Sequence, residues 1–365
     1  MQRVMIIAGA ILAVLAFIAV GLIFFINTAP QFGGKPTKQQ KEKYAASPHY
    51  RDGRFYNSVE TPLRNPDMSF AATMREFLKD GPDREPGKPL PIEKLNASHF
   101  SQIDSHAVSI TWLGHSAVLI EFYGHIFLAD PMLGQYASPV SFLGPKRFNK
   151  ELALDPYDIP HVDAIILSHD HYDHLDYGAI KILHEKTDRF FVPLGVAPHL
   201  LHWGVRADKI VELDWWQSSA FHGDVEFIAT PARHFSGRRY TDNAKTFWAS
   251  WMIRNDSRAI YFGGDSGYGP HFKEIGDKYG PFDVTMLENG AYNIAWPFVH
   301  MMPEQTAQAH LDLQGKVLLP IHWGQFNLST HAWNEPIERL TVAAQEKNIT
   351  LVTPQIGETF VVGKK

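Results

Sequence analysis

The chain begins with a long hydrophobic segment and then changes to a mixed polar pattern. Residues 4–26 are uncharged and almost wholly apolar, and this run of 23 residues ends at Asn27. As a helix, such a segment can cross a hydrocarbon core of about 30 Å. A cleaved signal peptide usually has a shorter apolar region and a small-residue cleavage site, which residues 27–30 match poorly. We therefore expect an uncleaved transmembrane anchor, and basic residues on both flanks leave its orientation open.

The next segment, residues 27–105, is rich in Pro, Lys, Asp and Gly. Its clearest periodic piece is helix-like and covers residues 70–79. We interpret this segment as a spacer and an N-terminal extension that packs on the main domain. The remaining residues, 106–365, are expected to form one catalytic domain.

From residue 107 onward, short apolar runs alternate with segments of helical period. The predicted strands are 107–112, 116–122, 125–129, 162–167, 189–193, 225–230, 246–254, 258–262, 283–287 and 317–321. The predicted helices are 176–186, 271–279, 303–314 and 335–348. This order indicates packed sheets covered by helices, although the pattern alone does not separate that arrangement from other α/β folds.

Composition narrows the chemistry. The formal net charge of -5 and the absence of a basic stripe give no support for nucleic-acid binding. The chain has no cysteine, which excludes disulfides, thiolate catalysis and cysteine-ligated zinc. It has 19 histidines, but most histidines in any protein are not ligands, so only their placement is informative.

The most informative stretch follows the predicted strand at 162–167. Residues 168–174 read Ser-His-Asp-His-Tyr-Asp-His. Imidazole and carboxylate groups together suit zinc and related divalent metals. The alternative is a polar turn that caps a helix starting near Asp176, but three histidines at this spacing would be unusual for that purpose. We predict metal ligands here, and we expect Asp170, between two of them, to be a solvated spacer.

Four more polar residues follow predicted strands. They are Asp130, His234, Asp265 and His322. The ends of strands gathered at one edge of an α/β sheet are the usual location of a site. Taken alone, each histidine could be an ordinary core or surface residue. Their order after the 168–174 cluster favours metal binding.

This order resembles the ligand pattern of metallo-β-lactamase-fold hydrolases: His-x-His-x-Asp-His, a lone His, Gly-Asp, and a His after a strand. Over about residues 107–340 the chain is also similar to the N-acyl-phosphatidylethanolamine-hydrolysing phospholipase D branch. The blocks that carry this similarity are 111–115, 144–148, 168–176, 191–195, 212–216, 280–283, 290–292 and 321–324. The resemblance implies an αβ/βα metallo-β-lactamase four-layer sandwich with two zinc ions.

The resemblance also implies a division of the ligands between the two zinc ions. One ion would be held by His169, His171 and His234, the other by Asp173, His174 and His322, and Asp265 would bridge them. Asp173, Asp265 and a bridging hydroxide would remove three of the four positive charges, which leaves about one for an anionic phosphodiester. We expect the catalytic residues to be Asp173, Asp265 and His300.

Other residues are expected to support the ligands or bind substrate. Asp130 and His115 would orient ligands, although Asp130 before a proline could simply form a turn. His300 matches a family histidine that contacts substrate and assists the leaving group. Substrate contacts are expected from Tyr292, Trp296, Phe298 and His300. If Trp296, Phe298, Met301 and Met302 are exposed together they form a lipid-facing lip, and if buried they are core.

The predicted function is a zinc-dependent phosphodiesterase of phospholipase D type. It would convert N-acyl-phosphatidylethanolamine-like phospholipids to phosphatidate and N-acylethanolamine by attack of the metal-bridging hydroxide. The alternatives are hydrolysis of a lactone, β-lactam or nucleotide phosphodiester, because fold does not fix function, and, less favoured, a non-catalytic metal-stabilised interaction domain. The expected partners are a phospholipid and the membrane, without nucleic acid, and a homodimer is left open. We expect a bacterial inner-membrane location with the side of the catalytic domain undetermined.

Overall fold

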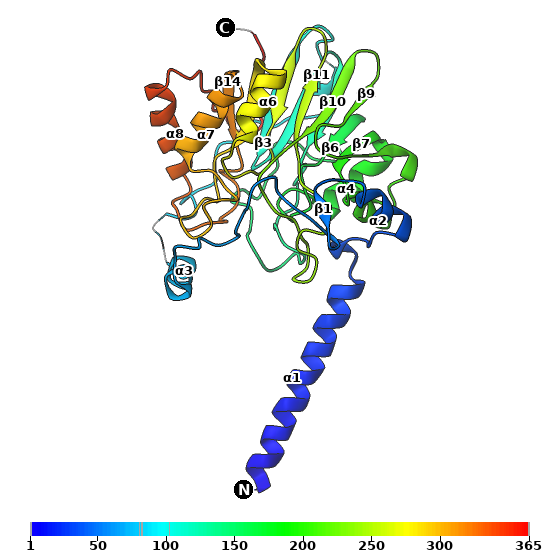
Figure 1. The fold of residues 1–365 in the computed structure, drawn as a ribbon, viewed down its shortest axis with the longest axis vertical. Coiled ribbons are helices and arrows are strands. Elements are labelled where there is room, and N and C mark those ends of the chain that lie inside the picture. The colour runs from blue at the N-terminus through cyan, green and yellow to red at the C-terminus, as the bar shows by residue number, and fades with distance from the viewer. Residues whose placement is uncertain (1, 80, 82, 102, 364–365) are drawn as a thin grey trace.

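Two β-sheets lie face to face, and helices cover their outer faces (Figure 1). The structure is a computed structural model that describes residues 2–79, 81, 83–101 and 103–363. The described residues form the expected α/β sandwich with mixed sheets.

The first sheet has seven strands in the order β15-β3-β4-β5-β6-β7-β8. Its strands are β3 (Val108–Gly114), β4 (Ala117–Phe122), β5 (His125–Ala129), β6 (Val162–Ile166), β7 (Thr187–Pro193), β8 (Ile210–Leu213) and β15 (Thr359–Val361). Strands β5 to β8 pair in parallel, and β15, β3, β4 and β5 pair antiparallel. The carboxyl ends of β5 and β6 therefore open at the same edge.

The second sheet has six strands in the order β14-β13-β12-β11-β10-β9. Its strands are β9 (Ser218–Phe221), β10 (Val225–Thr230), β11 (Ser250–Arg254), β12 (Ala259–Phe262), β13 (Phe282–Glu288) and β14 (Gly315–Ile321). Strands β12, β13 and β14 are parallel, and the others pair antiparallel.

The core fills the space between the sheets. Phe191 of β7 stacks on Phe227 of β10 with ring centroids 4.0 Å apart, so side chains of the two sheets interdigitate. Helices α4 (Tyr177–Leu183) and α5 (Ala197–His202) belong to the first sheet's outer side, and α6 (His271–Tyr279), α7 (Pro303–Asp312) and α8 (Glu335–Glu346) cover the second sheet. A second apolar cluster, which includes Phe272 and Leu340, joins α6, α7 and α8 to their sheet.

Two differences from the predicted strands have physical reasons. Residues 246–249 were expected to begin a strand, but β11 starts only at Ser250. The amide of Phe247 instead donates to the carbonyl of Leu194, and that of Ala249 to the carbonyl of Ser168, so this segment bonds to loops of the other sheet. The short edge strands β8, β9 and β15 were missed because four residues or fewer carry little periodicity.

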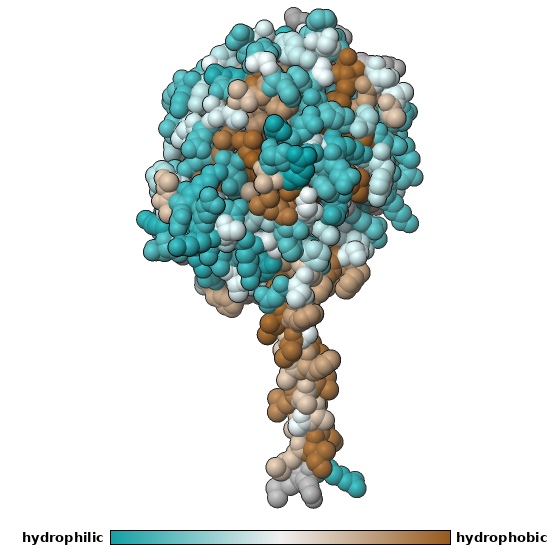
Figure 2. Space-filling view, turned by 90° about the vertical axis from the view of Figure 1, so that its right-hand side faces the viewer, coloured by the Kyte–Doolittle hydropathy of each residue, from teal (hydrophilic) through white to brown (hydrophobic). Residues whose placement is uncertain are grey.

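The N-terminal helix α1 (Gln2–Thr28) projects from the domain as a hydrophobic stalk, whereas the domain surface is mostly hydrophilic (Figure 2). Residues 3–28 are long and apolar enough to cross a membrane, with an 18-residue window of mean hydropathy 3.0 in which no residue is buried. The following segment contains the short helix α2 (Lys38–Tyr44), the hairpin of β1 (Tyr50–Arg51) and β2 (Arg54–Phe55), and α3 (Phe70–Phe77). Tyr44 and Phe55 are buried against the domain, so this segment packs on it.

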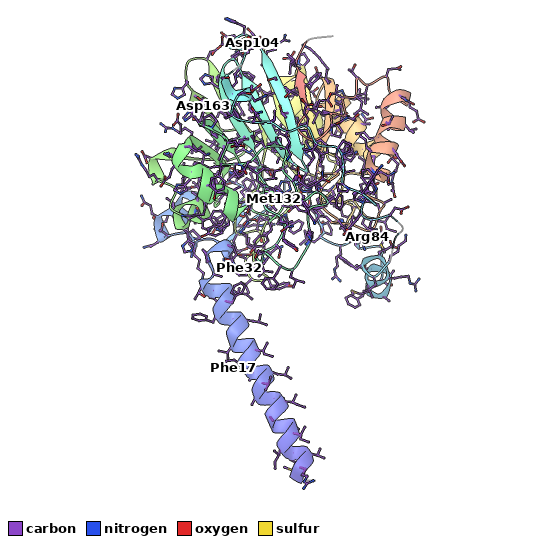
Figure 3. All side chains as sticks on the ribbon, turned by 180° about the vertical axis from the view of Figure 1, so that it is seen from behind. Phe17, Phe32, Arg84, Asp104, Met132 and Asp163 are labelled. Carbon is purple, nitrogen blue, oxygen red and sulfur yellow. The ribbon has the colours of Figure 1, made fainter. Side chains whose placement is uncertain are left out.

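The base of α1 is seated on the domain by hydrogen bonds from two arginines. Arg239 Nε donates to the carbonyl of Ile26 and Arg238 Nε to that of Gln31. Phe32, at this junction (Figure 3), is buried and lies edge-on to Tyr172 at 6.5 Å. Helix α1 therefore leaves the domain beside the 168–174 loop.

Candidate metal centre

Most of the candidate residues follow the carboxyl ends of strands in both sheets. Residues 168–174 follow β6, Asp130 follows β5, His234 comes after β10, Asp265 after β12, and His322 directly after β14. Because the parallel strands end at the same edge, residues far apart in the sequence meet there.

Three imidazoles form the first half of the cluster. His171 Nδ1 lies 2.8 Å from His169 Nε2 and 3.3 Å from His234 Nε2. Burial lowers the pKa of all three rings, and those of His169 and His234 fall well below the usual range. Neutral rings direct lone pairs, instead of charges, at one point, which is what a single divalent ion requires.

The second half combines a carboxylate with two further imidazoles. Asp173 Oδ2 lies 3.3 Å from His322 Nε2 and 3.5 Å from His174 Nε2. Burial works to raise the pKa of Asp173, but the neighbouring histidines outweigh it and hold the pKa well below its usual range. Asp173 is therefore ionised at neutral pH, as its predicted role as a metal ligand requires.

Asp265 lies between the two halves. Its Oδ2 is 3.1 Å from His174 Nε2 and from His322 Nε2. The same oxygen is 3.7 Å from His234 Nε2 and 3.9 Å from His169 Nε2. The preceding Gly264 has φ +55°, and a Cβ there would stand 2.4 Å from Ser168 Cβ. Only glycine lets this turn approach the 168–174 loop so closely.

The donor set fits two divalent cations. The first half groups three His atoms within 4.8 Å of one another, and the second groups atoms of Asp173, His174 and His322, with His115, within the same distance. Asp265 Oδ1 and His174 Nε2 are buried without a hydrogen-bond partner among the described residues, a costly condition unless another group occupies the space. Five histidines and two carboxylates, the seven predicted ligands, thus meet in one buried cluster.

Asp130 contacts two residues of the 168–174 loop. Its Oδ2 lies 2.7 Å from His174 Nδ1, and its Oδ1 accepts from the amide of Ser168 at 2.7 Å. This contact fixes which nitrogen of His174 faces the cluster. His115 Nε2 lies 3.0 Å from Asp173 Oδ2, and burial together with His322 lowers its pKa to about 4. Both residues lie where the predicted orienting role requires.

The backbone at these positions is unusual. His115, Asp130 and His322 have φ of 51°, 39° and 63°, in the left-handed region that side chains other than glycine rarely adopt. Such conformations cost about 1–3 kcal/mol each and are found mainly at functional sites.

We expect Asp130→Asn to weaken metal binding by about 10–100-fold without unfolding the domain. The amide keeps the shape of the carboxylate but loses the charge that holds His174 Nδ1–H. Competition with a metal-chelating dye measures the affinity, and unchanged circular dichroism serves as the control for folding. Wild-type affinity in this variant would contradict the orienting role.

One sequence-based expectation was wrong. Asp170 is buried, not solvated. Its Oδ1 accepts from the amide of Gly237 at 2.7 Å, and its Oδ2 lies 3.3 Å from His199 Nε2. Arg238 Nη1 donates to the Asp170 carbonyl at 2.7 Å. Asp170 therefore joins the 168–174 loop to the segments that contain His199 and Gly237.

Sequence reasoning also missed Glu288, the last residue of β13. It is buried, and its Oε2 lies 2.7 Å from His300 Nδ1 while its Oε1 accepts from the amide of Met301 at 2.7 Å. Burial raises the pKa of Glu288, although His300 opposes this. The signal was available, because Glu288 follows a predicted strand just as Asp130 and Asp265 do.

A cavity of about 330 Å3 opens on this cluster. His171, Asp173, Asp265, His300 and His322 form its polar part, and its apolar walls include Leu63, Phe77, Phe235, Trp296 and Leu328. Among the predicted substrate residues, Trp296 and His300 line the cavity. Tyr292 is buried with its hydroxyl donating to Glu335 at 2.9 Å, and the Phe298 ring lies 4.8 Å from the Arg233 guanidinium, so neither is among the lining residues. Met301 is core, so of the two alternatives for Trp296, Phe298, Met301 and Met302 the four residues do not form an exposed lip.

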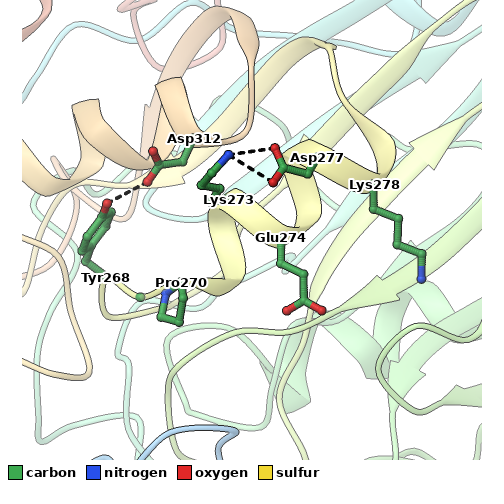
Figure 4. Close-up of a pocket in the computed structure, with 8 residues that line it drawn as sticks. Tyr268, Pro270, Lys273, Glu274, Asp277, Lys278 and Asp312 are labelled. Atoms are coloured by element: carbon green, nitrogen blue, oxygen red, sulfur yellow. Dashed lines mark hydrogen bonds and ion pairs between the residues drawn. The ribbon is translucent and has the colours of Figure 1, made fainter.

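A larger groove of about 750 Å3 lies elsewhere, beside α6 (Figure 4). Some of its charged groups have partners within the groove, since Lys273 pairs with Asp277 and the Tyr268 hydroxyl donates to Asp312. No cluster of potential metal ligands was found there among the described residues. The chemistry therefore points to the smaller cavity.

Comparisons with known proteins agree with this geometry. The model of the β-lactamase superfamily domain matches residues 125–323. An uncharacterized protein of Mycobacterium tuberculosis is 40% identical over 86% of this chain and 84% of its own length. The N-acyl-phosphatidylethanolamine-hydrolyzing phospholipase D 1 of Caenorhabditis elegans is 34% identical over 74% of this chain and 80% of its own. A metallo hydrolase structure from Ignicoccus hospitalis superposes with a TM-score of 0.53 at 22% identity, covering 71% of this chain and 100% of that one.

Proposed function

The chain belongs to the β-lactamase superfamily of metallo-hydrolases, and on that premise we propose that it is a binuclear zinc phosphodiesterase of phospholipase D type. The proposed substrate is an N-acyl-phosphatidylethanolamine-like phospholipid, and the products are phosphatidate and an N-acylethanolamine. The proposed ligands are the seven residues of the cluster, and residues 106–365 form the proposed catalytic domain.

One observation carries the choice of substrate class. The cavity has apolar walls, including Leu63, Phe77 and Trp296, and a polar floor of potential metal ligands. A phospholipid has the same division, with an anionic phosphodiester beside long apolar chains. A small polar substrate would leave these walls without a partner. The 34% identical relative named for hydrolysis of this lipid class supports the same choice.

Two zinc ions, when bound, would supply Lewis acidity and a nucleophilic water that is deprotonated near neutral pH. The protein's own groups position the substrate and move the proton. The Glu288 carboxylate holds His300 through Nδ1, so Nε2 is the nitrogen available to the cavity. His300 can then donate a proton to the departing head-group oxygen.

We further propose that α1 anchors the protein in a bilayer as a single-pass helix, in a bacterial inner membrane. Its length and apolar surface support this assignment. An anchor keeps the cavity close to a substrate that is confined to the membrane.

The function is tested with the full chain, purified in detergent with zinc. An N-acyl-phosphatidylethanolamine, bis-p-nitrophenyl phosphate and a lactone are supplied in parallel, and products are measured by mass spectrometry or absorbance. We expect both phosphodiesters to be cleaved. Turnover of the lactone alone would overturn the proposal, and two bound zinc ions without any turnover would favour a metal-stabilised interaction domain.

We expect His300→Ala to slow hydrolysis of the N-acyl-phosphatidylethanolamine by about 10²–10⁴-fold. Hydrolysis of bis-p-nitrophenyl phosphate should change far less, because p-nitrophenolate leaves without a proton. Initial rates on the two substrates give the comparison. An equal loss on both would contradict the role as proton donor, and His202→Asn, a change at an exposed histidine, is the matched control.

A further inference from the structure

Helix α3 carries an apolar stripe that the domain does not cover. Phe70, Met74, Phe77 and Leu78 recur at intervals that place them on one helical face. Phe70 is 69% exposed and Leu78 77% exposed, and Thr73 is the helix's buried residue. An amphipathic helix in a soluble domain normally turns this stripe inward. Here the stripe faces outward.

The stripe continues into the cavity of the metal centre. Phe77 lines that cavity, and its ring centroid lies 4.9 Å from that of Trp296. Just before the helix, Asn65 binds the 292–302 loop, because its amide donates to the Ala295 carbonyl at 2.8 Å. Helix α3 is thus part of the cavity mouth.

Helix α3 also lies at the end of the molecule from which α1 projects (Figures 1 and 3). A second exposed apolar pair, Phe142 and Leu143, lies in a loop near the base of α1. Phe142 lines a groove of about 430 Å3 together with Phe25 of α1 and Tyr172 of the 168–174 loop. Exposed apolar side chains therefore occur at both the α1 side and the α3 side of this end.

Hydrogen bonds from Arg238, Arg239 and Trp203 fix the orientation of α1 relative to this end of the domain. Arg238 Nε and Nη2 donate to the Gln31 carbonyl, and Arg239 Nη2 donates to the Gly33 carbonyl. Trp203 Nε1 donates to the Pro30 carbonyl at 2.7 Å. With these bonds the chain after α1 is no free linker, so a bilayer that contains α1 meets the domain at this end.

We infer that α3, with the Phe142–Leu143 loop, is a second membrane contact that holds the mouth of the metal-centre cavity against the lipid surface. We name these side chains the apolar rim: Leu63, Phe70, Met74, Phe77, Leu78, Phe142 and Leu143. The inference rests on the proposed function and deepens it, since lipid would enter the cavity past Phe77 and Leu63 directly from the bilayer. Arg64 and Arg75, which are exposed around α3, suit the anionic headgroup layer, whereas Lys79 pairs with Glu76.

The absence of cysteine allows a direct test on the full chain. Leu78→Cys is labelled with an environment-sensitive fluorophore, and the protein is reconstituted into phosphatidylethanolamine–phosphatidylglycerol vesicles with or without a doxyl-labelled quencher lipid. Val342→Cys on α8, 55% exposed and remote from the rim, is the matched control. We expect quenching by the doxyl lipid at position 78 and none at position 342.

An unquenched label at position 78 would overturn the inference. So would a pyrene label at position 78 that forms excimers at high dilution in the vesicles, because a second copy of the chain would then cover α3. This readout does not depend on turnover. It therefore separates failure of the membrane contact from failure of the proposed function.

A paired activity measurement adds a functional readout. In the Phe70→Asp, Leu78→Asp double variant, hydrolysis of vesicle lipid should fall about tenfold because charged side chains resist insertion into the interface. Hydrolysis of water-soluble bis-p-nitrophenyl phosphate should stay at the wild-type rate. Equal rates on vesicle lipid for variant and wild type would count against the contact.

Discussion

Asp265→Asn should remove most of the bound metal and lower turnover by about 1000-fold or more, which corresponds to about 4 kcal/mol of transition-state stabilisation. Asp265 Oδ2 lies within 4 Å of four of the predicted ligand imidazoles, two in each half of the cluster. The amide keeps the volume of the side chain but removes the charge that offsets two divalent cations. Plasma mass spectrometry gives the metal content per chain, and bis-p-nitrophenyl phosphate gives the rate.

Asp283→Asn is the matched control for that experiment. Asp283 is also a buried carboxylate in a partnered environment, since it accepts from Arg258, Lys316 and the amide of Ala259. Its loss should cost stability and leave the metal content near two per chain. A full metal complement in Asp265→Asn would contradict the bridging assignment.

Arg238→Met should destabilise the domain by about 3–5 kcal/mol, because the buried groups that Arg238 bonds lose their donor and their compensating charge. The Arg238 side chain donates to the carbonyls of Asp170, Leu175 and Gln31, and its guanidinium lies 4.0 Å from the Tyr172 ring. Arg238 therefore connects the 168–174 loop to the base of α1. Denaturant unfolding measures the free energy, and chelator competition should show weaker metal binding as well.

Arg206→Met provides the comparison for this effect. Arg206 is exposed and pairs with Asp208, two residues along the chain, so its removal should change the free energy of unfolding by less than about 0.5 kcal/mol. If both variants unfolded at the same denaturant concentration as wild type, the hydrogen bonds of Arg238 to the 168–174 loop and the base of α1 would not contribute to stability.

Much of the fold and of the ligand set was predictable from local signals. The strands that lead to Asp130, Asp265 and His322 are apolar runs that end in a polar residue, and the helix at 271–279 has the predicted bounds. The fold class is confirmed by the sheet order and the family match. The roles of the seven ligands stay a prediction, although the structure brings all seven together.

The error at Asp170 has a different cause, since its burial depends on contacts that are remote in the sequence. Asp170 reads as polar and solvated, but its partners Gly237 and His199 are 67 and 29 residues away. Tyr292 and Phe298 lie in the expected loop and contact Glu335 and Arg233, and their role in substrate binding stays a prediction. The spacing of apolar residues in a sequence predicts which face of a helix or strand is buried. It does not predict which loop covers a given side chain.

The left-handed backbone at His115, Asp130 and His322 places two independent restrictions on each position. The torsion angle admits glycine, asparagine and aspartate most readily and strongly disfavours β-branched residues. The proposed chemistry, in contrast, calls for an imidazole or a carboxylate. Few amino acids satisfy both requirements. We therefore expect almost every single substitution at these three positions to impair either the fold or the metal centre. The cavity wall around Leu63 and Phe77 carries no such double restriction, so its residues can change while those of the metal centre stay fixed.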